Sequence, residues 1–234
     1  MFLSTGIEYG PILKYVRKMA EEDPRIKIVN SGVNIKQMLS ERGYPFKSKE
    51  HSEKLHTYQL SGMCKTVTDY LGMGEKKTFL CPKMLHYQFS PEFKLKVSKR
   101  CCDVLKKNVS NRWARANGKT ITITGIRNEE GGIRKSVHNC VSFRGGEITK
   151  FHPLLVVNEE WENWFIESRR ITLCELYYPP FNFERTGCAG CPYNVDLQEE
   201  LDLLEKFLPA EKKKCEYIWK EVYDEYRRLG YRLK

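Results

Sequence analysis

Four of the nine cysteines in this chain have a spacing that could hold a metal centre. Cys101 and Cys102 are adjacent, whereas Cys188 and Cys191 form a CxxC loop that is followed by Pro192. At the start of a helix, two adjacent side chains diverge by about 100°. This divergence suits two corners of a cubane cluster better than two ligands of one small tetrahedral ion. The spacing therefore favours a [4Fe–4S] cluster on these four cysteines.

Two alternatives stay open for the same residues. A CxxC loop by itself is shared by zinc sites, redox dithiols and iron–sulfur sites. Two CxxC pairs would favour zinc, whereas an adjacent pair with a distant CxxC favours the cluster. Zinc on the four cysteines, and no metal at all, are the alternative interpretations.

The other five cysteines are predicted to be structural, apart from Cys81, whose role the pattern leaves undecided. Cys215 lies one turn before Ile218 and Trp219 on the apolar face of the last expected helix, so we expect a buried thiol. Cys140 and Cys174 lie among apolar neighbours, and Cys64 falls on the apolar stripe of the helix expected at 51–71, which favours a structural role without settling it. An odd number of cysteines without an export signal argues against a disulfide framework.

The composition indicates a folded protein with a preference for anions. The net charge is +10, from 40 Lys and Arg against 30 Asp and Glu, and 41% of residues are hydrophobic. A basic surface favours nucleotides, phosphosulfates or nucleic acid, although it can also serve solubility alone. No apolar run approaches the roughly 18 residues of a membrane span. The first ten residues lack a basic segment and a long apolar run, so we expect a cytoplasmic protein without a signal peptide.

Short strands alternate with helices along the chain, which predicts a parallel α/β sheet. The expected strands are residues 2–6 with their turn, 25–29, 120–124 and 147–151. Three expected helices span residues 34–42, 51–71 and 101–116. One more begins near Pro11 and another after the cap Asn158. Two further helices are expected after Val195, divided at Pro209.

Four motifs resemble, in type and order, those of the phosphoadenosine phosphosulfate reductase family. They are CCD at 101–103, TGIRNEEGGIRK at 124–135, FHPL at 151–154 and RTGCAGCP at 185–192. LSTG at 3–6 is similar to the family's LDTG turn, with Ser4 in place of Asp. The likeness is closest to the iron–sulfur branch, which includes adenylylsulfate reductases and proteins of DNA sulfur modification. It implies an adenine nucleotide α-hydrolase-like fold with a doubly wound, mostly parallel sheet.

The resemblance also implies a domain organisation and two departures from the family. Residues 1–194 correspond to the α/β domain with the cluster site, and 195–234 to a helical C-terminal extension packed on it. The family's SGGKDS-type phosphate loop is expected before LSTG, and with the first strand it is missing from this sequence. The family's reductases end in a Cys-Gly-Leu/Ile-His tail, whereas this chain ends in YRRLGYRLK.

The resemblance places substrate contacts in the turn 125–135, where Arg127, Arg134 and Lys135 surround two glycines. Such a turn could bind phosphate or sulfate, or it could be a solvated basic turn. The segment 44–52 is similar to one in uncharacterised relatives, in which Lys49 and His51 would face the cleft. The alternative is a helix N-terminus capped by Ser48. The expected nucleotide-binding residues are Ser4, Thr5, Gly6, Lys49, His51, Arg127, Glu129, Arg134 and Lys135.

The leading interpretation is a [4Fe–4S] protein that binds an adenine nucleotide or phosphosulfate. As an enzyme it would be an oxidoreductase of the sulfonucleotide reductase type, with weak or no activity alone. The alternative is a partner subunit or binding module, for example in nucleic-acid sulfur modification, whose phosphate loop is lost or supplied by another chain. A zinc-stabilised nucleic-acid binder is a third interpretation, which the adjacent cysteine pair disfavours.

Overall fold

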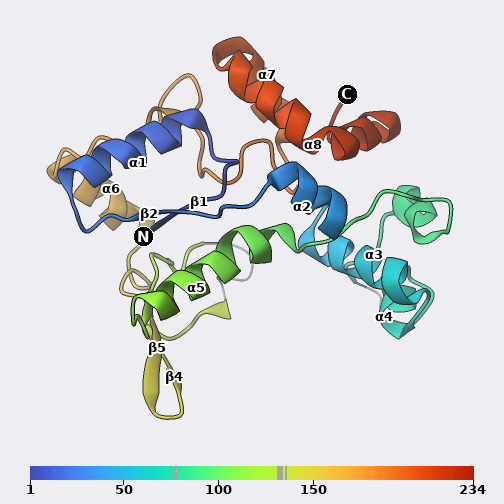
Figure 1. Ribbon diagram of the computed structural model, residues 1–234, viewed down its shortest axis with the longest axis horizontal. Coiled ribbons are helices and arrows are strands. Elements are labelled where there is room, and N and C mark those ends of the chain that lie inside the picture. Colours follow the sequence, from blue (N-terminus) through green and yellow to red (C-terminus); the bar gives the residue numbers. More distant parts are fainter. Residues whose placement is uncertain (76–77, 131–133, 135) are drawn as a thin grey trace. The chain divides into compact units, whose positions relative to one another are not determined.

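The computed structural model describes residues 1–75, 78–130, 134 and 136–234 (Figure 1). The chain forms two compact units. Unit 1 comprises Met1–Val109 and Glu175–Lys234, and unit 2 comprises Ser110–Cys174. Each unit has its own small sheet. The expected α/β class is therefore confirmed, whereas the described residues show two small sheets in place of one doubly wound sheet.

Unit 1 begins with a strand–helix–strand element. Strand β1 (Phe2–Ser4) pairs in parallel with β2 (Ile28–Asn30), with Ser4 opposite Asn30, and helix α1 (Gly10–Glu22) connects them. The second strand was expected at 25–29 but begins later. Asp23 accepts hydrogen bonds from the backbone N–H and the guanidinium of Arg25, which holds a turn after α1.

The remaining helices of unit 1 include the expected ones, with one correction, and two 3₁₀ segments that the sequence did not predict. They are α2 (Ile35–Arg42), α3 (Lys49–Ser61), α4 (Lys65–Tyr70), the 3₁₀ helix η1 (Lys83–Phe89), the π-helical segment η2 (Asp103–Lys107), the 3₁₀ turn η4 (Glu175–Tyr177), α7 (Leu197–Phe207) and α8 (Pro209–Leu229). One continuous helix over 51–71 was wrong. Gly62 has φ +70° and ends α3, so α4 starts as a separate helix.

Several predicted helix ends are confirmed by their caps. The Asn34 side chain accepts a hydrogen bond from the Gln37 backbone and Gly43 ends α2. Ser48 caps α3 by accepting from the His51 backbone, as in the alternative interpretation of the segment 44–52. Such side chains satisfy N–H groups that have no partner inside the helix.

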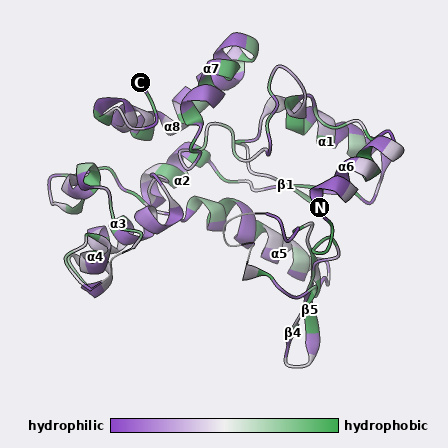
Figure 2. Ribbon diagram, turned by 180° about the vertical axis from the view of Figure 1, so that it is seen from behind, coloured by the Kyte–Doolittle hydropathy of each residue, from purple (hydrophilic) through white to green (hydrophobic). Residues whose placement is uncertain are grey.

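Helix α8 supplies much of the core of unit 1. Its buried side chains are Cys215, Ile218, Trp219, Val222, Tyr223 and Tyr226. Figure 2 shows apolar and polar residues alternating along α7 and α8, as expected for helices that bury one face. The two helices divide at Pro209, and the Cys215 side chain is fully buried, as the sequence predicted.

Unit 2 is built on a three-stranded sheet. Strand β5 (Glu147–Phe151) lies between β3 (Thr122–Ile123), which is parallel to it, and β4 (Val141–Arg144), which is antiparallel. The expected strands 120–124 and 147–151 correspond to β3 and β5. Helix α6 (Glu159–Ser168) is capped by Asn158, as predicted.

Helix α5 (Asn108–Ala116) begins in unit 1 and continues into unit 2. Helix α5, segment η2 and the helical turn at Cys101 and Cys102 together account for the helix expected at 101–116. Within the described part of the chain, no helix combines the length and apolarity needed to cross a membrane.

Candidate functional site

The four cysteines predicted to bind a metal centre all lie in unit 1. Cys101 and Cys102 form the helical turn that leads into η2. Cys188 and Cys191 lie in the loop before α7, which is tightened by a hydrogen bond of 3.2 Å from the Cys191 backbone N–H to the Cys188 carbonyl. None of the nine cysteines forms a disulfide.

The four thiols influence one another electrostatically. The Cys101 thiol donates a hydrogen bond to the Cys102 sulfur, which raises the pKa of Cys101 and lowers the pKa of Cys102. Burial, and then the nearby Cys188, raises the pKa of Cys191 to about 12. Cys188 and Cys191 also contribute to the raised pKa of Cys101. The two cysteine segments, distant in sequence, are therefore neighbours in space.

Lys106 is a cationic residue of this site that the sequence interpretation missed. Its ammonium group donates a hydrogen bond to the Cys188 sulfur. Burial lowers the pKa of Lys106, but the nearby Cys188 and Cys102 outweigh burial and raise it. Lys106 lies four residues after Cys102, on the same helical face. That spacing was the available signal.

The donor set fits a thiolate-bound cluster. Within the described residues, no three His, Cys, Asp or Glu side chains already surround a common point that could hold a metal ion. Cys101 and Cys102 instead hydrogen-bond to each other. Four soft sulfur donors beside a lysine suit iron–sulfur chemistry better than a hard cation, and cysteines give up their protons when a metal binds.

The turn after β1, where Ser4, Thr5 and Gly6 were expected to bind a nucleotide, holds an internal carboxylate. Glu8 accepts hydrogen bonds from the Thr5 backbone at 2.8 Å, from the Thr5 hydroxyl at 2.5 Å and from the Gly6 backbone at 3.0 Å. Thr5 and Glu8 are buried. The turn thus has donors arranged for an oxyanion, and Glu8 satisfies them.

Lys49 and His51 were both predicted to face a cleft. In the structure Lys49 lies near Cys102, whereas His51 lies in the core. Lys49 begins α3 and lowers the pKa of Cys102, as a cation near that sulfur should. His51 is fully buried, with its ring nitrogens 3.0 Å from the Tyr70 hydroxyl and 2.8 Å from Gln88 Oε1. Burial lowers the pKa of His51 to about 4, so the ring is neutral at physiological pH.

Cys81, which the sequence left undecided, lies in the same core. Its sulfur is 3.9 Å from Nδ1 of His51. Burial raises the pKa of Cys81 to about 11. A thiol attacks as its thiolate, so this cysteine–histidine contact is a packing arrangement and not an activated nucleophile.

The charged residues of the turn at 125–135 lie in unit 2 and pair largely with acidic groups. Arg127 Nη1 is 3.0 Å from Glu162, and Arg134 pairs with Glu130. Glu129 accepts a hydrogen bond of 2.8 Å from the Glu159 backbone at the start of α6. Lys135 and the two glycines, Gly131 and Gly132, lie outside the described residues.

A basic cavity of about 390 Å³ lies in unit 2. Its lining residues are Ile126, Arg134, Ser136, Val137, His138, Asn139, Ser142, Lys150 and His152. Thr124 Oγ1 is 2.6 Å from Nδ1 of His152, and Lys150 has no ion pair within the described residues. Hydrogen-bond donors and a free ammonium make this cavity a candidate anion site.

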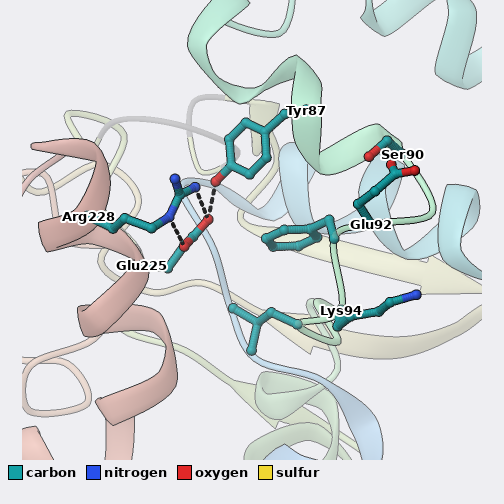
Figure 3. Close-up of a pocket in the computed structure, with 8 residues that line it drawn as sticks. Tyr87, Ser90, Glu92, Lys94, Glu225 and Arg228 are labelled. Atoms are coloured by element: carbon teal, nitrogen blue, oxygen red, sulfur yellow. Dashed lines mark hydrogen bonds and ion pairs between the residues drawn. The ribbon is translucent and has the colours of Figure 1, made fainter.

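A larger cavity of about 490 Å³ lies in unit 1 between η1, the segment after it and α8 (Figure 3). Arg228 binds Glu225 at 2.8 Å, and the Tyr87 hydroxyl donates to the same carboxylate. These polar groups are therefore engaged with one another, and we assign the cavity no ligand.

The chain belongs to the phosphoadenosine phosphosulfate reductase domain family, whose model matches residues 76–194. The matched segment contains all four cysteines of the candidate site and the basic cavity of unit 2. Membership indicates a function related to sulfonucleotides and binding of a nucleotide or phosphosulfate. A comparison with curated proteins finds no significant match.

Proposed function

We propose that this protein binds a [4Fe–4S] cluster through Cys101, Cys102, Cys188 and Cys191. The observation that supports this most is that four reduced thiols from two distant segments shift one another's pKa values, beside Lys106. The iron–sulfur core would carry positive charge, the four thiolate ligands would outweigh it, and Lys106 would balance the remaining negative charge. Zinc on the same residues is the alternative.

We further propose that the basic cavity of unit 2 binds the anionic group of an adenine nucleotide or phosphosulfate. Arg134, Lys150 and His152 provide charge-assisted or neutral hydrogen bonds of the kind that recognise phosphate and sulfate. As an enzyme the protein would be a sulfonucleotide reductase with weak or no activity alone, in a reducing, cytoplasmic environment. The doubly wound parallel sheet of the family is part of this proposal, supported by the parallel pairs β1–β2 and β3–β5.

A partner subunit or binding module is the second candidate function. Its support is the net charge of +10, which favours nucleic acid or another large polyanion as a ligand. In this form the protein acts as a binding module or as a subunit beside a second chain.

The metal content tests the cluster proposal. Protein purified without oxygen is expected to be brown and to contain about four irons per chain, because four cysteine thiolates hold such a cluster. Iron, zinc and protein are measured in the same sample. Stoichiometric zinc without iron, or neither metal in intact protein after reconstitution with iron and sulfide, would contradict the proposal.

The cavity proposal predicts weaker anion binding when its cations are removed. Lys150→Ala and Arg134→Ala are expected to weaken binding of adenylylsulfate, or of its 3′-phosphorylated form, by roughly tenfold to a hundredfold. Charge-assisted hydrogen bonds of about 1.5–3 kcal/mol account for that loss. Titration calorimetry measures the dissociation constants.

Lys119→Ala is the control for this measurement. Lys119 is an exposed residue of unit 2 that does not line the cavity, so its removal changes the net charge alone. Equal losses in the Lys119 and Lys150 variants would show a general charge effect and contradict a site. Absence of binding by the unaltered chain would favour the partner-subunit function.

A further inference from the structure

The CxxC loop, Cys188–Pro192, is held by side chains of helix α8. The Trp219 indole donates to the Ala189 carbonyl at 2.9 Å, and the Tyr223 hydroxyl donates to the Gly190 carbonyl at 2.5 Å. The Tyr226 hydroxyl donates to the Pro192 carbonyl at 2.9 Å. These donors stand on one buried face of α8. Three carbonyls of a five-residue loop are thus fixed by a single helix.

Glu200 on α7 holds the same loop by accepting a hydrogen bond from a backbone N–H of the loop. One carboxylate oxygen accepts from the Gly190 backbone at 2.6 Å and from the Tyr9 hydroxyl. The other oxygen accepts from the Asn194 side chain at 2.6 Å. Glu200 is only 7% exposed and has no cationic partner within the described residues. A buried carboxylate is costly unless hydrogen bonds satisfy it, and here three donors do so.

The loop is also fixed to the turn after β1. The Ala189 backbone N–H donates to the Ile7 carbonyl at 2.7 Å. Tyr9, whose hydroxyl binds Glu200, comes from the same turn. The loop therefore has partners on α7, on α8 and on the turn, all within unit 1.

We propose that helices α7 and α8 form a clamp that holds the CxxC loop in its ligand-binding shape before a metal centre binds. Glu200 is the central positioning residue of this clamp. The part of the inference that concerns the cluster rests on the proposed function. Fixing the loop in advance reduces the conformational entropy lost on binding, and partners of the ligand loop commonly govern how tightly a metal is retained.

The clamp is tested first in protein free of metal, by amide hydrogen exchange. The Gly190 amide is expected to be protected in the unaltered chain. In Glu200→Ala it should exchange at least tenfold faster, because its acceptor is gone. Glu200→Gln keeps an acceptor oxygen and should restore most of the protection.

Glu211→Ala is the matched control. Glu211 is a carboxylate on α8 that accepts a backbone N–H from Gly10 at 3.0 Å and has no hydrogen bond to the CxxC loop within the described residues. This variant should leave exchange at Gly190 within twofold of the unaltered chain. Equal acceleration in the Glu200 and Glu211 variants would overturn the proposal, as would an unprotected Gly190 in the unaltered protein.

Iron release gives a second readout. In loaded protein, Glu200→Ala and Tyr223→Phe should lose iron to a chelator at least fivefold faster than the unaltered chain. Tyr87→Phe, which removes a hydroxyl bonded to Glu225 elsewhere on α8, should release iron at the unaltered rate. Release that is equally slow in all variants would overturn the clamp. A chain that shows the expected amide protection yet takes up no iron would support the clamp and overturn the cluster proposal.

Discussion

Cys102→Ser and Cys191→Ser are each expected to lose most of the bound iron and the brown colour. A serine hydroxyl does not ionise near neutral pH and is a poor ligand for iron–sulfur clusters. Either substitution alone should release the metal from both cysteine segments, because one cluster would join the helical turn at Cys102 to the loop at Cys191. Iron analysis and the visible spectrum of protein purified without oxygen measure the effect. Both variants should also unfold at lower denaturant concentration than the loaded unaltered chain.

Two cysteines outside the site serve as controls for this prediction. Cys64 is a partly exposed residue before α4, and Cys174 is buried in unit 2. Cys64→Ser and Cys174→Ser should keep the full iron content, although the second variant buries a hydroxyl and loses some stability. Retention of about four irons in Cys102→Ser and Cys191→Ser would reject these residues as ligands.

Local features of the fold could be predicted from the sequence because they depend on neighbouring residues. The short helix expected at 34–42, the Asn158 cap and the division at Pro209 each follow from a few adjacent side chains. The continuous helix over 51–71 was wrong because Gly62 ends α3, although the apolar spacing continues through it. Periodicity alone could not show which of the two signals dominates.

The candidate site was predictable only in part, for the same reason. The spacing of the cysteines pointed to four thiols that influence one another electrostatically in the structure. Lys106 could have been found from its position one turn after Cys102. Glu200 could not, because its bonds to Tyr9 and Gly190 depend on how distant segments pack. His51 is likewise buried by Tyr70 and Gln88, contacts that no local pattern reveals.

Gly190→Ala is expected to disrupt the CxxC loop and to destabilise the metal-free protein. Gly190 has φ +59°, and an added Cβ would lie 2.4 Å from the Tyr223 hydroxyl and 2.8 Å from the Cys215 Sγ. Both neighbours are fully buried and cannot move away freely. The left-handed backbone costs about 1–2 kcal/mol for alanine. Overpacking adds about 1–3 kcal/mol. We therefore expect a loss of roughly 2–5 kcal/mol in the free energy of unfolding of the metal-free protein.

Gly118→Ala separates the two contributions. Gly118 also has φ +59°, but an added Cβ would meet nothing within 4 Å. This variant places alanine in the same left-handed backbone conformation and changes the unfolded chain in the same way. Its free energy of unfolding should therefore fall by only about 1–2 kcal/mol. Urea denaturation of both variants gives the difference, which measures the contact with Tyr223 and Cys215. Equal losses in the two variants would mean that the loop is free to move away from α8. Because the Gly190 carbonyl and amide are the groups that Tyr223 and Glu200 hold, such a result would also contradict the clamp.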